Sequence, residues 1–140
     1  LFGNVKGTVK NLTVENVSIS GAPKFIGALV GRLNDGLIEN CHVKNATVKA
    51  YHATADACGD KVGGIVGHAG NDGVVVKDCT VVNSAIYAGR DAGQIAGAAK
   101  AVNVINCSAA SVTVAVNPDT TCTDGSAGNN IREEVIGRLL

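Results

Sequence analysis

Apolar and polar residues alternate with a period of two along several short segments of the chain. The first of these segments has its apolar residues at Val9, Leu12, Val14, Val17 and Ile19. A period of two is typical of strands, because their side chains point to opposite faces in turn, whereas an amphipathic helix needs a period of about 3.6. Gly and Asn residues interrupt the segments at short intervals, so the pattern predicts many short strands.

Two blocks of sequence recur along the chain. One has two glycines four residues apart and occurs at residues 26–31, 62–67 and 92–97 (IGALVG, VGGIVG and AGQIAG), with a worn copy at 134–139. The other begins with Asn or Asp and occurs at residues 11–19, 40–48, 78–86 and 106–114, at offsets of 29, 38 and 28. The repeating unit is therefore about 28 to 30 residues long, and one step is longer by about 10.

Repeats of this length predict an all-β fold, a parallel β-helix (solenoid) of about four coils with three short strands in each coil. The three strands are the Gly block, the apolar stretch before the Asn block, and the strand that follows it. Neighbouring strands lie about 4.8 Å apart, so equivalent residues of successive coils form columns. The whole chain, 1–140, is expected to be one domain and a segment of a longer repeat protein.

Several of these columns have a predictable role. The inner column consists of Leu12, Cys41, Cys79 and Cys107. Two corner columns, whose side-chain amides bond to their neighbours above and below, consist of Asn11, Asn40, Asp78 and Asn106, and of Asn16, Asn45, Asn83 and Ser111. On the outside, charges of opposite sign face each other at Lys10, Glu39 and Lys77, and at Glu15 and Lys44. The Asn-Asp-Gly sequences at 34–36 and 71–73 are predicted to be turns.

Composition and charge narrow the classes of function. Apolar residues make up 46% of the chain and charged residues 17%, which argues against disorder. Lys and Arg number 12, as do Asp and Glu, so the chain lacks the basic surplus of a nucleic-acid-binding protein. No apolar run approaches the roughly 20 residues of a membrane span, so no membrane insertion of this segment is expected. Aromatic residues are only 3%, which favours a repetitive core of small side chains.

The two blocks resemble a known repeat family. The Gly-x-hydrophobic-hydrophobic-Gly block, combined with sequences such as Gly-Leu-Ile-Glu-Asn-Cys at 36–41, resembles the GLUG repeat over roughly residues 1 to 116. That repeat occurs in bacterial surface adhesins and in non-catalytic regions of IgA-cleaving metallopeptidases. The resemblance implies a right-handed parallel β-helix in an exported, extracellular protein of the bacterial cell surface. It also implies an adhesin that binds a host surface protein or a glycan, or alternatively a stalk or spacer that displays another domain.

The extra residues of the longer units are concentrated in two insertions, at 51–60 and 117–130, which leave the same corner of the predicted coils. Insertions on one face of a repeat protein often form its binding surface, although surface loops also tolerate added length. The candidate ligand-binding residues at this corner are Tyr51, His52, Asp56, Asp60, Tyr87, Asp119 and Asp124. Stacking of sugar rings would use the aromatic residues Tyr51, Tyr87 and Phe25.

Two of the five cysteines, Cys58 and Cys122, lie in these two insertions. Exported proteins retain disulfides, so a Cys58–Cys122 bridge is a hypothesis that the sequence raises. The two positions are nominally two strand spacings apart, about 9.6 Å. The loops must therefore lean together to reach the Cα separation of about 5.5 Å that a disulfide requires.

The remaining chemistry favours a protein without catalysis. His52, Asp56, Cys58 and Asp60 match no closed zinc pattern, and the acidic residues of 117–130 lack the spacing of a calcium loop, so no metal or cofactor is predicted. Aligned repeats place no cluster of carboxylates on neighbouring coils, and no His-Glu-x-x-His motif occurs. A polysaccharide-degrading β-helix enzyme is therefore the least favoured hypothesis.

The C-terminal residues from 130 onward allow two interpretations. Residues 137–139 match 31–33, which predicts a fifth strand in the stack. Residues 130–133 also resemble a capping box, and Ile131, Val135 and Leu139 are spaced like one face of a terminal helix. The end strands of a solenoid are unpaired, so we expect a monomer or weak end-to-end association.

Overall fold

The computed structural model of the chain describes residues 1–21, 24–51, 58–120, 122 and 124–140. Strands dominate these residues, and the short 3-10 helix η1 (Ala101–Asn103) is the one helical element among them. The described strands form three sheets, in which every strand pair is parallel. The predicted all-β class with parallel strands is confirmed.

The first sheet, here called sheet A, has seven strands: β1 (Phe2–Lys10), β5 (Val30–Glu39), β9 (Val66–Ala69), β10 (Val75–Lys77), β13 (Ala96–Ala99), β14 (Val104–Ile105) and β16 (Ile136–Leu139). Sheet B has six strands: β2 (Thr13–Glu15), β3 (Ser18–Gly21), β6 (His42–Lys44), β7 (Thr47–Ala50), β11 (Thr80–Ala88) and β15 (Ser108–Val116). Sheet C has three strands: β4 (Lys24–Gly27), β8 (Asp60–Gly63) and β12 (Arg90–Gly93).

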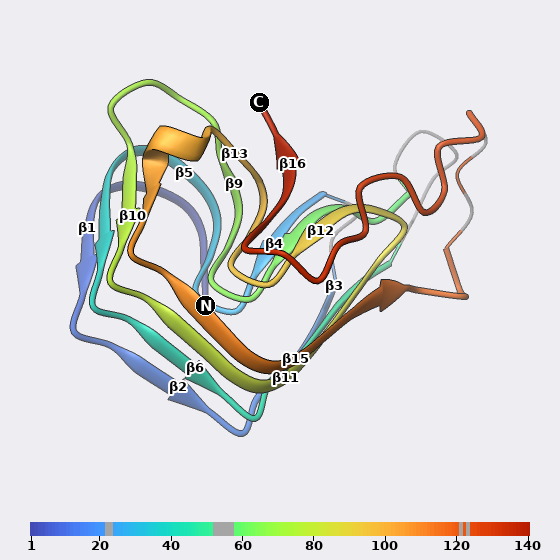
Figure 1. The fold of residues 1–140 in the computed structure, drawn as a ribbon, viewed down its shortest axis with the longest axis horizontal. Helices are drawn as coiled ribbons and strands as arrows, with labels where there is room; N and C mark the ends of the chain where they lie inside the picture. The colour runs from blue at the N-terminus through green and yellow to red at the C-terminus, as the bar shows by residue number, and fades with distance from the viewer. Residues whose placement is uncertain (22–23, 52–57, 121, 123) are drawn as a thin grey trace.

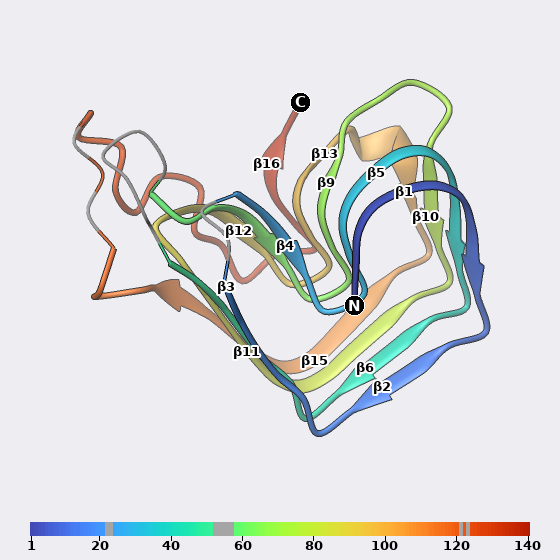
Figure 2. The same cartoon turned by 180° about the vertical axis from the view of Figure 1, so that it is seen from behind.

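The chain visits the sheets in the same order on each pass, from C through A to B (Figures 1 and 2). One pass runs from β4 through β5 to β6 and β7, and the next pass begins at β8 beside β4. Residues at the same position of successive sequence repeats pair with each other in the sheets. Gly63 pairs with Gly27 and with Gly93, and His42 pairs with Thr13 and with Thr80.

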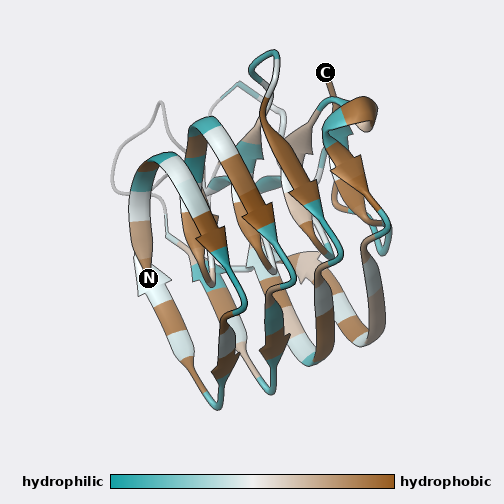
Figure 3. Ribbon diagram, turned by 90° about the vertical axis from the view of Figure 1, so that its left-hand side faces the viewer, coloured by the Kyte–Doolittle hydropathy of each residue, from teal (hydrophilic) through white to brown (hydrophobic). Residues whose placement is uncertain are grey.

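The corners of the Asn blocks have a left-handed backbone. All eight residues of the two predicted corner columns have φ between 48° and 57°. Asn and Asp enter this region more readily than other residues with a Cβ, because their short polar side chains bond locally. Nδ2 of Asn40 donates to Oδ1 of Asn11 at 2.9 Å, and Nδ2 of Asn45 donates to Oδ1 of Asn16 at 3.1 Å. The expected columns are present, and Figure 3 shows hydrophilic bends at equivalent places in successive passes.

Small aliphatic side chains and thiols fill the interior. The largest fully buried side chains include Leu29, Leu33, Ile38, Ile65, Ile86 and Ile95. Cys41 and Cys79 are fully buried and Cys107 is half-buried, as expected for the inner column. The Cys79 thiol donates to the Lys77 carbonyl at 3.1 Å, and a hydrogen bond with Cys107 together with burial raises the pKa of Cys79. Cys79 is therefore an unreactive core residue.

Each Gly block forms a corner between two sheets, and the prediction that it forms a single strand is wrong. In the first block, β4 ends at Gly27 and β5 begins at Val30, with Leu29 fully buried between them. The two strands approach closely, since a Cβ on Gly31 would lie 2.6 Å from the carbonyl oxygen of Phe25. The second glycine of the block is thus required by backbone contact, and the corner is re-entrant, with its tip directed into the molecule (Figure 1).

The predicted turn at 34–36 is also wrong, because these residues continue strand β5. The register between β1 and β5 shifts after Val5, which leaves Asn34 as the extra residue of a bulge. The Asn34 carbonyl accepts a hydrogen bond from Nδ2 of Asn71 at 2.7 Å, so the unpaired group is satisfied. The second Asn-Asp-Gly sequence, at 71–73, does form the turn between β9 and β10.

The C-terminal residues form a further strand, and the alternative of a terminal helix is wrong. β16 pairs with β13, and Ile131 forms a bridge with Ala92. A Cβ on Gly137 would clash with the backbone of Ala92, so the worn copy keeps the close backbone approach of the earlier Gly blocks. This contact favours the stacked strand over a helix.

The predicted alternation of charge on the outer surface is confirmed. Nζ of Lys77 lies 2.7 Å from the Glu39 carboxylate, and Nζ of Lys44 lies 3.9 Å from that of Glu15. These pairs are partly exposed to solvent, so each contributes little to stability. Their main effect is to disfavour registers that bring like charges together.

Replacing Asn45 by Ala should lower the free energy of unfolding by about 2 kcal/mol, because Ala is strained in the left-handed region and the hydrogen bond to Asn16 is lost. Asn45→Gly should cost about half as much, since Gly accepts the backbone conformation and loses only the hydrogen bond. Urea unfolding followed by circular dichroism measures both variants. Equal destabilisation by the two substitutions would show that backbone strain plays no part at this corner.

Candidate functional site

The loop at 117–130 leaves the end of β15, at the corner where sheet B gives way to sheet C (Figure 1), and it is anchored by Asn117. The Asn117 side chain is fully buried, and its Nδ2 donates to the carbonyl of Ala50 at 2.7 Å. The Asn117 backbone N–H donates to the carbonyl of Ala88 at 2.8 Å. Its Oδ1 accepts a hydrogen bond from the backbone N–H of Asp119 at 3.1 Å, which closes an Asx turn. One buried residue thus ties the loop to the two preceding passes.

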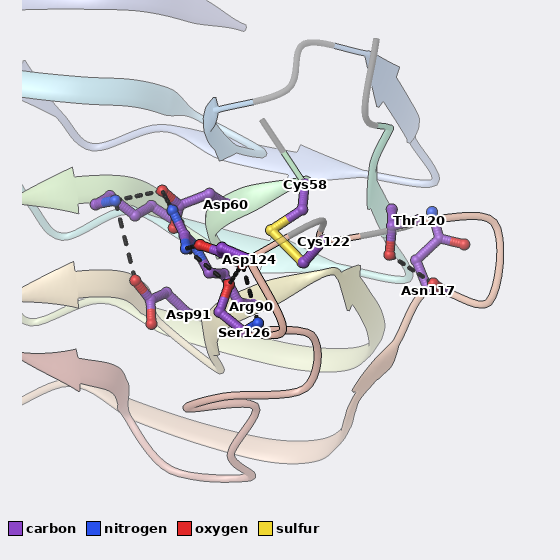
Figure 4. Close-up of a disulfide and its surroundings, with 10 residues drawn as sticks. Cys58, Asp60, Arg90, Asp91, Asn117, Thr120, Cys122, Asp124 and Ser126 are labelled. Carbon is purple, nitrogen blue, oxygen red and sulfur yellow. Dashed lines mark hydrogen bonds and ion pairs between the residues drawn. A yellow bond between two sulfur atoms is a disulfide. The ribbon is translucent and has the colours of Figure 1, made fainter. Parts of the chain in front are cut away.

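A disulfide joins the two insertions (Figure 4). It links Cys58 to Cys122, with a Cα–Cα distance of 4.9 Å, so the insertions lean together as the sequence hypothesis required. Gly89 lies against the backbone of Cys58, and a Cβ on Gly89 would clash with the carbonyl of Cys58. The absence of a side chain at Gly89 therefore allows this segment to lie on the next pass.

Four residues gather on the outer face of sheet B beside this corner. Lys49 pairs in register with Tyr87, and its Nζ lies 5.2 Å from the centroid of the Tyr51 ring. Nζ of Lys49 also lies 3.0 Å from Oδ2 of Asp119, and this hydrogen bond raises the pKa of Lys49. The side chain of Tyr51 is 41% exposed. We call Lys49, Tyr51, Tyr87 and Asp119 the tyrosine patch.

A network of charged groups holds the second half of the loop (Figure 4). Nη1 of Arg90 donates to Oδ2 of Asp124 at 3.0 Å and to Oγ of Ser126 at 2.8 Å. Hydrogen bonds from Ser126, aided by the charge of Arg90, lower the pKa of Asp124. Arg90 also lies 3.5 Å from Oδ2 of Asp60. The loop is therefore attached to β12, the strand that carries Arg90.

Asp60 does not lie in an exposed loop, although its place among the candidate ligand-binding residues assumes one. Asp60 is the first residue of β8, is only 1% exposed, and lies 2.5 Å from Nζ of Lys61. Burial alone would raise the pKa of Asp60, but the hydrogen bond and charge of Lys61 and the charge of Arg90 outweigh it and lower the pKa. The insertion ends before Asp60, and the carboxylate is occupied by internal cations.

The other candidates divide into three groups. Tyr51, Tyr87 and Asp119 come together in the tyrosine patch. Asp124 belongs to the Arg90 network instead. His52 and Asp56 lie outside the described residues.

Sequence reasoning missed Lys49, Arg90 and Asn117. A signal for Lys49 was present, because the offset of 38 between successive Asn blocks places it beside Tyr87. The Asn-Pro-Asp sequence at 117–119 likewise suits an Asx turn. Nothing in the sequence indicated which carboxylates Arg90 would bind.

The tyrosine patch offers a partly exposed tyrosine ring beside an ion pair between a lysine and an aspartate. This combination suits a ligand with an apolar ring face and peripheral hydroxyl groups. Within the described ranges, no three His, Cys, Asp or Glu side chains are placed to hold a metal ion. Among the same residues, no helix has the length and apolar character needed to cross a membrane.

Alkylation in denaturant should modify three cysteines without reductant and five after reduction, because Cys41, Cys79 and Cys107 are free and Cys58 and Cys122 are bonded. Intact mass spectrometry counts the added groups. Reduction should also destabilise the fold by about 2–4 kcal/mol, as expected for a bond that closes a long loop. Five modified cysteines before reduction would contradict the disulfide.

Asp60 should make stability depend on pH in the acid range. The pKa of Asp60 is lower in the folded protein than in the unfolded chain. Its contribution to folding stability is therefore fully present at pH above the pKa of the unfolded chain, and it is lost as pH falls through the pKa of the folded protein. Asp60→Asn should therefore reduce the slope of stability against pH below about pH 4. Unfolding midpoints in urea at each pH measure this slope. Asp35→Asn, at an exposed position, is the control.

Comparison with models of known protein families, with curated proteins and with solved structures found no match to this chain.

Proposed function

We propose that the chain is a right-handed parallel β-helix of about four coils. The support is the coincidence of the sequence repeat with the strand register in all three sheets. Crossover connections between parallel strands of one sheet are right-handed in about 98% of cases, which favours that hand. The same repeats support relationship to the GLUG-repeat proteins.

We further propose that the chain functions outside the cell as a non-catalytic binding module of a bacterial surface protein. The Cys58–Cys122 disulfide supports this location, because disulfides persist mainly in oxidising compartments. Asp60 and Asp91, two acidic residues that share Lys61 as a neighbour, are 1% exposed and bound to cations. Neither is available as a general acid or base, which supports a role in binding.

The tyrosine patch is the proposed binding surface, and a neutral glycan is its proposed ligand. The observation that carries this assignment is the exposed ring of Tyr51, held beside Lys49 with Tyr87 on the adjacent strand. An aromatic ring stacks on the apolar face of a sugar, while Lys49 and Asp119 bond to its hydroxyl groups. The disulfide and Asn117 fix the loop that supplies Asp119, so little ordering is required on binding.

A glycan array probed with the purified chain, followed by calorimetry on any hit, tests the proposal. Tyr51→Ala should weaken binding about two- to tenfold, because a stacked aromatic ring contributes roughly 0.5–1.5 kcal/mol. Phe2→Ala is the matched control, since Phe2 is an aromatic residue with a similar exposure of 43% on another part of the surface.

Equal binding by the Tyr51 and Phe2 variants would remove the tyrosine patch as the site. Binding of no glycan or host surface protein by the intact chain would favour the second hypothesis, a spacer that displays another domain.

A further inference from the structure

A column of glycines lines the re-entrant corner between sheets C and A. It consists of Gly31, Gly67 and Gly97, and a Cβ on Gly67 would lie 2.6 Å from the carbonyl oxygen of Lys61. Because no side chain fits on this floor, the flanking residues of the two sheets face each other across it. We use the name glycine groove for this corner and the residues that flank it, and Figure 1 shows the corner between β12 and β13.

The residues that flank the groove vary in chemistry although their backbone positions repeat. On one side they are Phe25, Lys61 and Asp91 of sheet C and Asn130 of the segment beside β12, all with φ between 51° and 60°. On sheet A they are Arg32, His68, Ala98 and Arg138, which pair in register. Contacts cross the groove at both ends, from Arg32 to the Phe25 ring and from Arg138 to the Asp91 carboxylate.

At the end of the groove that contains Asp91, the charged groups are paired with one another. Oδ1 of Asp91 accepts a hydrogen bond from Nδ2 of Asn130 at 2.6 Å. Oδ2 of Asp91 lies 3.2 Å from Nη1 of Arg138 and 3.9 Å from Nζ of Lys61. Each oxygen of this buried carboxylate therefore has a partner from the chain itself.

The other end has excess positive charge. Arg32 makes no ion pair with any carboxylate in the described part of the chain, and its Cζ lies 5.4 Å from the Phe25 centroid. Nζ of Lys61 lies 5.5 Å from the same ring and is bonded to Asp60. An aromatic ring attracts a cation without neutralising it, so the charge of Arg32 remains available to an anion.

His68 lies against this cluster and responds to its charge. The imidazole meets the Phe25 ring edge-on, with centroids 5.5 Å apart. Burial first, and then the charges of Arg32 and Lys61, lower the pKa of His68, against a smaller opposing effect of Asp60. Nδ1 of His68 and Nε of Arg32 are both buried without a hydrogen-bond partner among the described residues. An acceptor from a ligand would offset the cost of leaving such nitrogens unpaired.

We propose that the Arg32 end of the glycine groove binds a carboxylate or sulfate group. The guanidinium of Arg32 forms the bidentate contact that these planar or tetrahedral anions favour, and His68 donates the second contact. The site is separate from the tyrosine patch and does not depend on the function proposed for it.

Titration of the full chain with sodium D-glucuronate, N-acetyl-L-glutamate and sodium sulfate tests this site, with D-glucose as the neutral comparison. The imidazole resonances of His68 report binding by nuclear magnetic resonance. Each anion that binds should shift them saturably and raise the pKa of His68, because a nearby negative charge favours the imidazolium form. Preference for glucuronate over N-acetylglutamate distinguishes a sugar source from a peptide source.

Arg32→Gln should weaken anion binding about tenfold or more and, without ligand, raise the pKa of His68. Arg132→Gln is the matched control, since Arg132 is about half exposed and lies 3.8 Å from Glu134, outside the groove. An unchanged amide spectrum away from β5 establishes that the Arg32 variant is folded. No saturable shift with any anion, or equal loss of binding in both variants, would overturn the proposal.

Discussion

The fold depends on keeping parallel strands in register while the chain bends sharply between them. A parallel ladder is held only if each bend occurs at the same residue of every pass. The left-handed backbone at Asn11, Asn40 and their equivalents provides that bend. Hydrogen bonds between neighbouring side chains, such as that from Asn40 to Asn11, hold the bend at the same residue from one pass to the next. A residue without a short polar side chain at these corners would lose both effects, so the corners determine where the sheets begin and end.

Sequence periodicity predicted this arrangement well because the constraint acts on single residues at fixed offsets. Pairing of His42 with Thr13 and Thr80 follows directly from the spacing of the Asn blocks. The Gly blocks do not indicate a corner by themselves, because their apolar residues suit a strand equally well. Only the distance between the backbones at Gly31 and Phe25 reveals that the glycines mark a corner. The bulge at Asn34 is not predictable for a similar reason, since Asn-Asp-Gly favours a turn locally and the neighbouring strand β1 overrides that preference.

The candidate site was predictable only in its position. The unequal lengths of the repeats indicate both insertions. Because each insertion contains one cysteine, they also raise the hypothesis of a disulfide between Cys58 and Cys122. Side-chain environment was not predictable, as Asp60 demonstrates: a polar residue beside a long insertion is expected to be exposed, yet Lys61 and Arg90 stabilise it in a buried position. Those partners come from the adjacent residue and from the next pass, and the sequence does not indicate the orientation of either side chain.

Structural and functional columns differ in what repeats along them. In a structural column both the backbone conformation and the residue type repeat, whereas in a functional column only the backbone conformation repeats. Asn11, Asn40 and Asn106 are alike because their left-handed conformation favours Asn. Phe25, Lys61 and Asp91 share the same left-handed conformation, with φ of 60°, 59° and 51°, although none of them is required by it. Phe and Lys are in fact disfavoured there, so their presence has a cost that the surrounding contacts must offset. The cation–aromatic contacts of Phe25 and the ion pairs of Lys61 supply that compensation. The glycine groove is therefore the place where this repetitive fold departs from what its backbone alone would select.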